Sequence, residues 1–381
     1  MPSTFAAADG ASRLVECMAR VEPLDEATMC ATRSRLDRLT KPPGSLGRLE
    51  RLAVQIAGIT RLPRPHLNSP VVVVMAADHG VVSEGVSAYP AAVTAQMVHN
   101  FAGGGAAINV LARQAAARVV VVDVGVAASL PAQLPIVHRK LARGTANLAH
   151  GAAMTRAQML AAIDIGLDLA VLETDVDHRA DVICLGEMGI GNTTAASAML
   201  AAITGLAVAE VTGRGTGIDD ATWNRKVAVI ERALRVNQPN RLDPLDVLAR
   251  LGGLEIAALV GLTLGAAARR VPILVDGFIA TVAALVAAEL CPLARGYMIA
   301  AHRSVEIGHR LALERLELEA LFAFDLRLGE GTGAALALPM LYAALAVLDE
   351  MATFEEAGVS AVPDSPVLTD NQMRAASNSE T

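Results

Sequence analysis

The chain alternates short apolar runs with longer segments of helical periodicity. Four runs rich in valine, isoleucine and leucine end in polar, glycine-bearing turns, and a fifth is weaker; they span residues 70–78, 118–125, 181–187, 271–277 and 294–302. Their apolar character is continuous rather than alternating, which is typical of strands covered on both faces. Helical patterns lie between them, at residues 104–117, 155–173, 219–236, 253–269 and 277–290. The alternation predicts an α/β fold with a parallel sheet, helices on both faces and ligands at the carboxyl ends of the strands.

The two ends of the chain differ from the middle. Before about residue 60 the pattern is helix, Pro-Gly break and helix, without a strand, and the stretch after Gly331 is again helical. We therefore expect residues 1–60 and 331–358 to form a small helical domain beside an α/β domain of residues 61–330. The polar stretch 359–381 is predicted to be a disordered tail.

Composition narrows the class of protein. Hydrophobic residues make up 53% of the 381 residues but aromatic ones only 3%, so the core must consist mainly of Ala, Val, Leu and Ile. The formal charge is -7 and lysines and arginines do not cluster, which argues against nucleic-acid binding. The four cysteines form no CxxC pair, as expected for free thiols in a reducing, cytoplasmic compartment.

One segment resembles a membrane span. Residues 331–348 carry no charge, but they are dominated by Ala and Gly, are interrupted by Pro339 and lack basic flanks. These features favour a helix buried inside the protein. The N-terminal stretch lacks a basic region followed by strong hydrophobes, so no signal peptide is expected and we predict no membrane association.

Two glycine-rich turns could hold an anion. "GEMGIGNTTAASAM" opens a helix after a strand, and "TGRGTGIDD" precedes a helix that carries Lys226. The first has GxxGxG spacing rather than the dinucleotide spacing GxGxxG, and no P-loop sequence GK[ST] occurs in the chain. Either turn alone is equally well explained as a tight turn. Both together, with the lysine, favour a phosphate site.

The ionisable residues allow more than one interpretation. Glu330, in "RLGEGTGAALALP", is by itself better explained as a favourable acid in a first helical turn than as a general base. If the segment were helical throughout, His302, Glu306 and His309 would share one helix face. A hydrogen-bonded set explains this spacing better than a metal cluster does. His79 at a strand end is read as a satisfied polar residue, with a substrate contact as the alternative. No serine or cysteine nucleophile motif is present.

Several motifs occur together in a fixed order. They are "KPPGSLGRLE", "AADHGVVSEGVSAYP", "GGAAINVLAR", "GEMGIGNTTAASA", "TGRGTGIDD", "LGGLEIAALVG", "DGFIATVAAL" and "RLGEGTGAALALP". With these motifs the chain closely resembles the nicotinate-nucleotide–dimethylbenzimidazole phosphoribosyltransferase family over roughly residues 25–355. The resemblance implies a Rossmann-like sheet domain, a small helical domain and a homodimer. It also implies transfer of phosphoribose from nicotinate mononucleotide to 5,6-dimethylbenzimidazole, a step of cobalamin lower-ligand synthesis, without metal or redox cofactor.

Roles for individual residues follow from that resemblance. Glu330 becomes the general base for the incoming benzimidazole, and Glu187 a second acid near the ribose or the base. The remaining implied substrate contacts form three groups. Ser87, Tyr89, Pro90 and Gln96 would wall the benzimidazole pocket; Met188, Gly189, Gly215, Thr216, Gly217 and Lys226 would meet phosphate and ribose; Asp276, Ser304, Leu328 and Gly329 would face the same cleft.

Two other functions are compatible with part of the pattern. A dehydrogenase would need the dinucleotide fingerprint, which the chain lacks. A non-catalytic nucleotide-binding protein could retain the glycine turns but has little reason to retain Glu330. The sequence leaves open whether a benzimidazole, a purine or a phenol is the preferred acceptor.

Overall fold

A single parallel sheet organises the molecule. The computed structural model describes residues 10–215 and 217–360, and all strands named below fall within them. The strands are β1 (Pro70–Ala77), β2 (Arg118–Gly125), β3 (Val137–His138), β4 (Val182–Met188), β5 (Ile273–Val275) and β6 (Met298–Ala300). They pair in parallel in the order β3-β2-β1-β4-β5-β6. The predicted α/β fold is confirmed, although β5 and β6 are shorter than the apolar runs suggested.

Helices make up most of the remaining described chain. In chain order they are α1 (Gly10–Ala19), α2 (Glu26–Arg38), α3 (Arg48–Thr60), α4 (Ala92–Ala102), α5 (Ala107–Gln114), α6 (Arg156–Thr174), α7 (Asn192–Thr204), α8 (Val208–Val211), α9 (Asp220–Asn237), α10 (Pro244–Leu251), α11 (Leu254–Ala268), α12 (Phe278–Leu290), α13 (Ile307–Leu316), α14 (Thr332–Glu350) and α15 (Phe354–Ala357). Two 3-10 helices, η1 (Gly80–Glu84) and η2 (Pro292–Tyr297), complete them.

The side chains of β1 alternate between two apolar layers. Val71, Val73 and Met75 join a core built mainly with α6, α11 and α12, whereas Val72 and Val74 join a core with α4, α5 and α14. Because every strand residue is covered on one face or the other, the run reads as continuously apolar in the sequence. The strand order reverses at β1, and in open sheets of this kind ligands bind at such a reversal.

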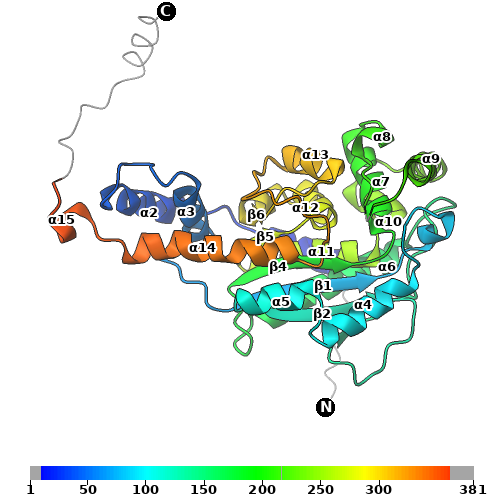
Figure 1. Cartoon of the computed structure of the whole chain (residues 1–381), viewed down its shortest axis with the longest axis horizontal. Helices are drawn as coiled ribbons and strands as arrows, with labels where there is room; N and C mark the ends of the chain where they lie inside the picture. The colour runs from blue at the N-terminus through cyan, green and yellow to red at the C-terminus, as the bar shows by residue number, and fades with distance from the viewer. Residues whose placement is uncertain (1–9, 216, 361–381) are drawn as a thin grey trace, which may run out of the picture.

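The two ends of the chain meet beside the sheet. Figure 1 shows α14 running from the sheet to the side of α2 and α3. There the Arg35 side chain donates to the carbonyl oxygens of Leu348 (2.7 Å) and Asp349 (3.1 Å), and so satisfies the last turn of α14. The first half of α14 contacts β1, β4 and β5 instead. The division into two separate domains with the boundaries given above stays a prediction.

The first helix does not join that helical group. Leu14 of α1 and the following Val21 are buried in the core formed with α6 and α11, on the opposite face of the sheet from α14. The amphipathic α1 can bury its apolar side there, which the strand-free pattern of residues 1–60 did not indicate. Residues 1–9 and most of the predicted tail, 361–381, lie outside the described residues.

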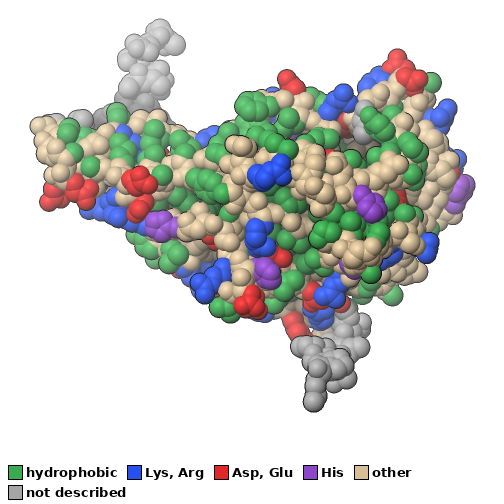
Figure 2. Space-filling model, turned by 60° about the horizontal axis from the view of Figure 1, so that its bottom comes forward, with side chains coloured by type: hydrophobic (Ala, Val, Ile, Leu, Met, Phe, Trp, Pro, Cys, Tyr) green, Lys and Arg blue, Asp and Glu red, His purple; other side chains and the backbone are tan. Residues whose placement is uncertain are grey.

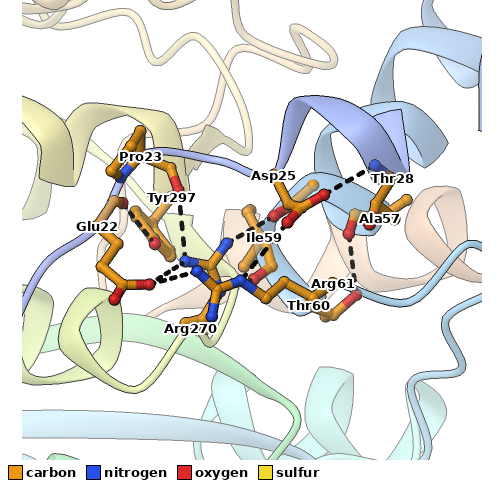
Figure 3. A network of polar contacts seen from close by, with 11 residues as sticks. Glu22, Pro23, Asp25, Thr28, Ala57, Ile59, Thr60, Arg61, Arg270 and Tyr297 are labelled. Carbon is orange, nitrogen blue, oxygen red and sulfur yellow. Dashed lines mark hydrogen bonds and ion pairs between the residues drawn. The ribbon is translucent and has the colours of Figure 1, made fainter. Parts of the chain in front are cut away.

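Arg270, just after α11, contacts α3 and the segment before α2. Its guanidinium donates to the carbonyl oxygens of Gly58 (2.8 Å) and Ile59 (2.9 Å) at the end of α3, and it also faces the Glu22 carboxylate at 3.3 Å (Figure 3). A cation at a helix C-terminus opposes the negative end of the helix dipole. The guanidinium carbon of Arg270 also lies 5.8 Å from the ring centroid of Tyr297. One side chain therefore contacts α3, the segment before α2 and η2.

By length and composition α14 could cross a membrane, and it is the one helix in the described part of the chain with that property. More than half of its apolar window is buried, and it contacts α3, α5, β1, β4 and β5. These contacts agree with the predicted buried helix.

Candidate active site

A cavity of about 640 Å³ opens at the carboxyl ends of the strands. This volume suits a small-molecule site. The wall comes from α4, the end of β4 with the start of α7, the start of α12, and the loops around residues 302–306 and 325–330. Of the predicted site residues, Tyr89, Glu187, Met188, Gly189, Gly215, Ser304, Leu328, Gly329 and Glu330 line it. The chain therefore brings together residues that lie far apart in the sequence.

Glu330 lies at one end of the cavity, just before α14. It is 4% exposed, and its Oε2 accepts a hydrogen bond of 3.4 Å from the N–H of Ile108, in the first turn of α5. Burial raises the pKa of this carboxyl, the Ile108 N–H opposes the rise, and the Asp276 carboxylate adds to it. A carboxylate with a raised pKa that faces a cavity is suited to accept a proton near neutral pH.

The glycines on both sides of Glu330 are required by its backbone. Gly329, Glu330 and Gly331 have φ values of +86°, +63° and +88°, in the left-handed region that glycine adopts without strain. A side chain at Gly329 would overlap the Glu187 carboxylate, and one at Gly331 would stand 2.6 Å from Val72. The tight backbone thus brings Glu330 and Glu187 to the same wall.

Glu187 is at the end of β4, next to the point where the strand order reverses. Its Oε2 accepts a hydrogen bond from the side-chain amide of Asn192 at the start of α7. Burial, reinforced by the nearby Glu255 carboxylate, raises the pKa of Glu187 to about 8, and the Asn192 bond partly opposes this. In the unliganded protein this carboxyl is therefore protonated at neutral pH. A cationic ligand beside it would favour the ionised form.

A cationic group lies behind the part of the cavity wall formed by Thr193 and Gly215. Lys226 is 1% exposed, and its Nζ donates to Thr193 Oγ1 at 2.9 Å and to the Gly213 carbonyl at 3.5 Å. Burial lowers the pKa of Lys226 to about 8, which the Glu306 carboxylate opposes. Arg327 lines the same part of the cavity and donates to the Gly215 carbonyl at 3.4 Å. Together with the N-terminus of α7, these groups can bind an anion.

Several predicted contacts do not line the cavity. Asp276 is buried and accepts hydrogen bonds from the N–H groups of Gly331 (3.1 Å) and Ala334 (3.0 Å), so it fixes the start of α14 behind Glu330. Ser87, Pro90, Gln96 and Gly217 are also not among the lining residues, although Tyr89 and Met97 of the same segment are. Their roles as substrate contacts stay predictions, and Thr216 lies outside the described residues.

The condition for a shared helix face of His302, Glu306 and His309 is not met, because α13 begins only at Ile307. His309 instead bonds Ser304 Oγ (2.8 Å) and Thr281 Oγ1 (3.0 Å), and burial lowers the pKa of His309 to about 3. Across residues 10–215 and 217–360, no three His, Cys, Asp or Glu side chains stand close enough to hold a metal ion.

Sequence reasoning missed part of the site. Asn192, Phe278 and Arg327 line the cavity, and each lies at a helix start or in a loop whose direction no local pattern reveals. It also missed that His79 pairs with Glu255, Nε2 to Oε1 at 2.6 Å, with both side chains fully buried behind Gly189. The prediction of a satisfied polar residue is therefore confirmed only for Nε2, because the buried Nδ1 of His79 has no hydrogen-bond partner among the described residues.

Comparisons with known proteins point to one family. A family model described as "Phosphoribosyltransferase" matches residues 21–359. The chain is 60% identical over 349 residues to the nicotinate-nucleotide–dimethylbenzimidazole phosphoribosyltransferase of Chloroflexus aggregans, covering 92% of this chain and 98% of that protein. A Roseiflexus protein of the same name is 57% identical over the same shares. The crystal structure of the Thermus thermophilus protein of that name superposes with a TM-score of 0.84 at 45% identity, covering 89% of this chain and all of that one.

Proposed function

The chain belongs to the family of nicotinate-nucleotide–dimethylbenzimidazole phosphoribosyltransferases, and on that premise we propose how its cavity carries out the reaction. The enzyme moves the 5-phosphoribosyl group from nicotinate mononucleotide to 5,6-dimethylbenzimidazole, in the synthesis of the cobalamin lower ligand. The products are α-ribazole 5′-phosphate and nicotinate. The observation that supports this most is one cavity that is lined by the buried Glu330 and by Arg327 and has Lys226 directly behind its wall.

The acceptor base lies at the Glu330 end. Tyr89, Val93, Met97 and Leu328 give the cavity apolar and aromatic surface, which suits a dimethylated ring. One ring nitrogen attacks C1′ with its lone pair, and the other nitrogen loses its proton to the Glu330 carboxylate. Because burial raises the pKa of Glu330, this carboxylate is a stronger base than an exposed one.

The leaving group needs no acid. The bond between C1′ and the pyridinium nitrogen breaks with its electron pair passing to the ring, so nicotinate leaves with a neutral ring. The pyridinium charge favours ionised Glu187, which stabilises positive charge on the ribose as that bond breaks. Gly189, Gly215, Ser304, Arg327 and Lys226 hold the phosphate and ribose at the opposite end.

The protein provides no nucleophile in this scheme, so C1′ is displaced once and its configuration inverts from β to α. A chromatographic assay for nicotinate release tests the activity directly. Nicotinate should accumulate only when the protein, nicotinate mononucleotide and dimethylbenzimidazole are all present. Release at the same rate without the base would mean hydrolysis and contradict the proposal.

We also propose that the enzyme acts as a cytoplasmic homodimer. The exposed side of α14 carries no charged residue between Leu336 and Val347. On the protruding part of the molecule in Figure 2, hydrophobic side chains lie among acidic and basic ones. Such a surface is suited to an interface between subunits. Light scattering coupled to size-exclusion chromatography tests the dimer, and a monomeric mass at micromolar concentration would exclude it.

A further inference from the structure

One carboxylate in the cavity has no part in the reaction described above. Glu306, the residue before α13, lines the phosphate end together with Arg327 and is 7% exposed. Its Oε2 is buried without a hydrogen-bond partner among the described residues. A buried carboxylate oxygen without a partner is costly to maintain, so its presence beside an anion site calls for a ligand that uses it.

The surrounding backbone keeps this carboxylate in place. A side chain at Gly213 would overlap Glu306 Oε2, so only glycine lets the loop and the carboxylate approach this closely. The carbonyl oxygen of the same Gly213 accepts the hydrogen bond from Lys226. Glu306, just before α13, and Lys226, in α9, therefore both contact the loop at Gly213. A large movement of either side chain would disturb this loop.

The charges at this end do not suit a phosphate dianion. Burial raises the pKa of Glu306. Lys226 from α9, the N–H of Gly215 and Arg327 from the loop before α14 oppose this rise, because each favours the ionised form. A phosphate ester brings about 1.5 to 2 negative charges at neutral pH. Placing it next to an ionised, buried carboxylate sets like charges against each other. Protonation removes this repulsion and turns the unpartnered oxygen into a hydrogen-bond donor.

We propose that the phosphate group of the nucleotide binds together with one proton, which Glu306 holds and donates as a hydrogen bond to a phosphate oxygen. The proton comes from solvent. This inference rests on the proposed function, because it takes the Lys226 end of the cavity as the phosphate site. His309 on α13 cannot take this role, since Ser304 and Thr281 occupy both of its ring nitrogens.

The proton can be counted by calorimetry with sulfate as the probe. Sulfate stays doubly charged between pH 6 and 7, so a proton taken up on binding must go to the protein. Titrations in two buffers of different ionisation enthalpy give the number of protons per bound sulfate. For the wild type we expect about 0.5 to 1 proton, with affinity falling by up to about tenfold per pH unit as pH rises.

Variants assign the proton to Glu306. Glu306→Gln should bind sulfate with almost no proton uptake and nearly constant affinity from pH 6 to 7. Glu306→Asp retains a carboxyl group and should keep the uptake, and Glu314→Gln, an exposed change on the same helix, should leave it unaltered. If Glu306→Gln does not fold, the wild-type proton count and the Glu306→Asp variant still test the proposal.

Three results would overturn the inference. They are zero proton uptake by the wild type, undiminished uptake by folded Glu306→Gln, and no binding of sulfate to the wild type at all. The nicotinate-release assay separates these outcomes from failure of the proposed function. An active wild type without proton uptake would remove the role of Glu306 alone, whereas an inactive wild type would remove the function.

Discussion

Replacing Glu330 by glutamine should separate catalysis from stability. The amide has nearly the same shape, and its oxygen can still accept the 3.4 Å hydrogen bond from the Ile108 N–H. It cannot accept the proton of the attacking benzimidazole. Loss of a general base costs roughly 10²- to 10⁴-fold in turnover, which corresponds to about 2.7–5.5 kcal/mol in the activation free energy.

The same change should not weaken the fold. Burial raises the pKa of Glu330 above its value in the unfolded chain. Below the unfolded pKa both states are protonated, and as pH rises through the folded pKa, ionisation increasingly favours the unfolded chain. Glutamine carries no such penalty, so at pH 8 the variant should have a melting temperature equal to or above that of the wild type.

Steady-state nicotinate release and thermal unfolding, measured on the same preparations, test both parts. The KM for nicotinate mononucleotide should change little, because the phosphate end of the cavity is untouched. The wild-type rate should also rise with pH as Glu330 ionises, and the variant should lack this rise. Exposed Glu314→Gln is the control. Turnover near the wild-type value, or a large fall in melting temperature, would refute the assignment of Glu330 as a buried base.

Three further predictions address the anion site, the stereochemistry and the contact between Arg270 and α3. Lys226→Ala should weaken nucleotide binding by about 1.5–3 kcal/mol but hardly affect free dimethylbenzimidazole; equal losses in calorimetry would make Lys226 structural. The product should be the α nucleotide, and a β anomeric proton signal in NMR would contradict single displacement. Arg270→Ala should lower the free energy of unfolding by about 1–3 kcal/mol, since its hydrogen bonds to Gly58 and Ile59 are lost. The control Arg310→Ala, at an exposed position, should change the free energy of unfolding by under about 0.5 kcal/mol. Equal effects of the two changes would mean that the contacts of Arg270 do not stabilise the fold.

The sequence was most informative where one local pattern decides the structure. Continuous apolar runs located β1, β2 and β4, because strands buried on both faces cannot alternate. The resemblance to the family drew attention to Glu330, and the structure adds that residues 329–331 have a left-handed backbone, which the sequence analysis did not predict. The uncharged, Ala- and Gly-rich composition of residues 331–348 also indicated the buried helix that the structure shows as α14.

Other features depend on contacts between distant segments. Nothing near Asp276 indicates that its carboxylate holds the first turn of α14, because its partners lie more than fifty residues further along the chain. The spacing of His302, Glu306 and His309 left open whether they share a helix face, since a periodic pattern does not show where a helix begins, and α13 begins only at Ile307. The sequence also did not predict that α1 packs against α6, because an amphipathic helix can cover either face of the sheet.

The position of α14 has a consequence for how the protein is made. The alternate face of β1 that carries Val72 and Val74 is covered in part by α14, near the other end of the chain. During translation, β1 leaves the ribosome long before residues 332–350 exist, so this apolar surface stays open in the nascent chain until synthesis is almost complete. The turn that carries Glu330 can acquire its final form only when α14 docks. Premature termination within α14 would therefore release a sheet with an exposed face, a species prone to aggregate rather than a less active enzyme.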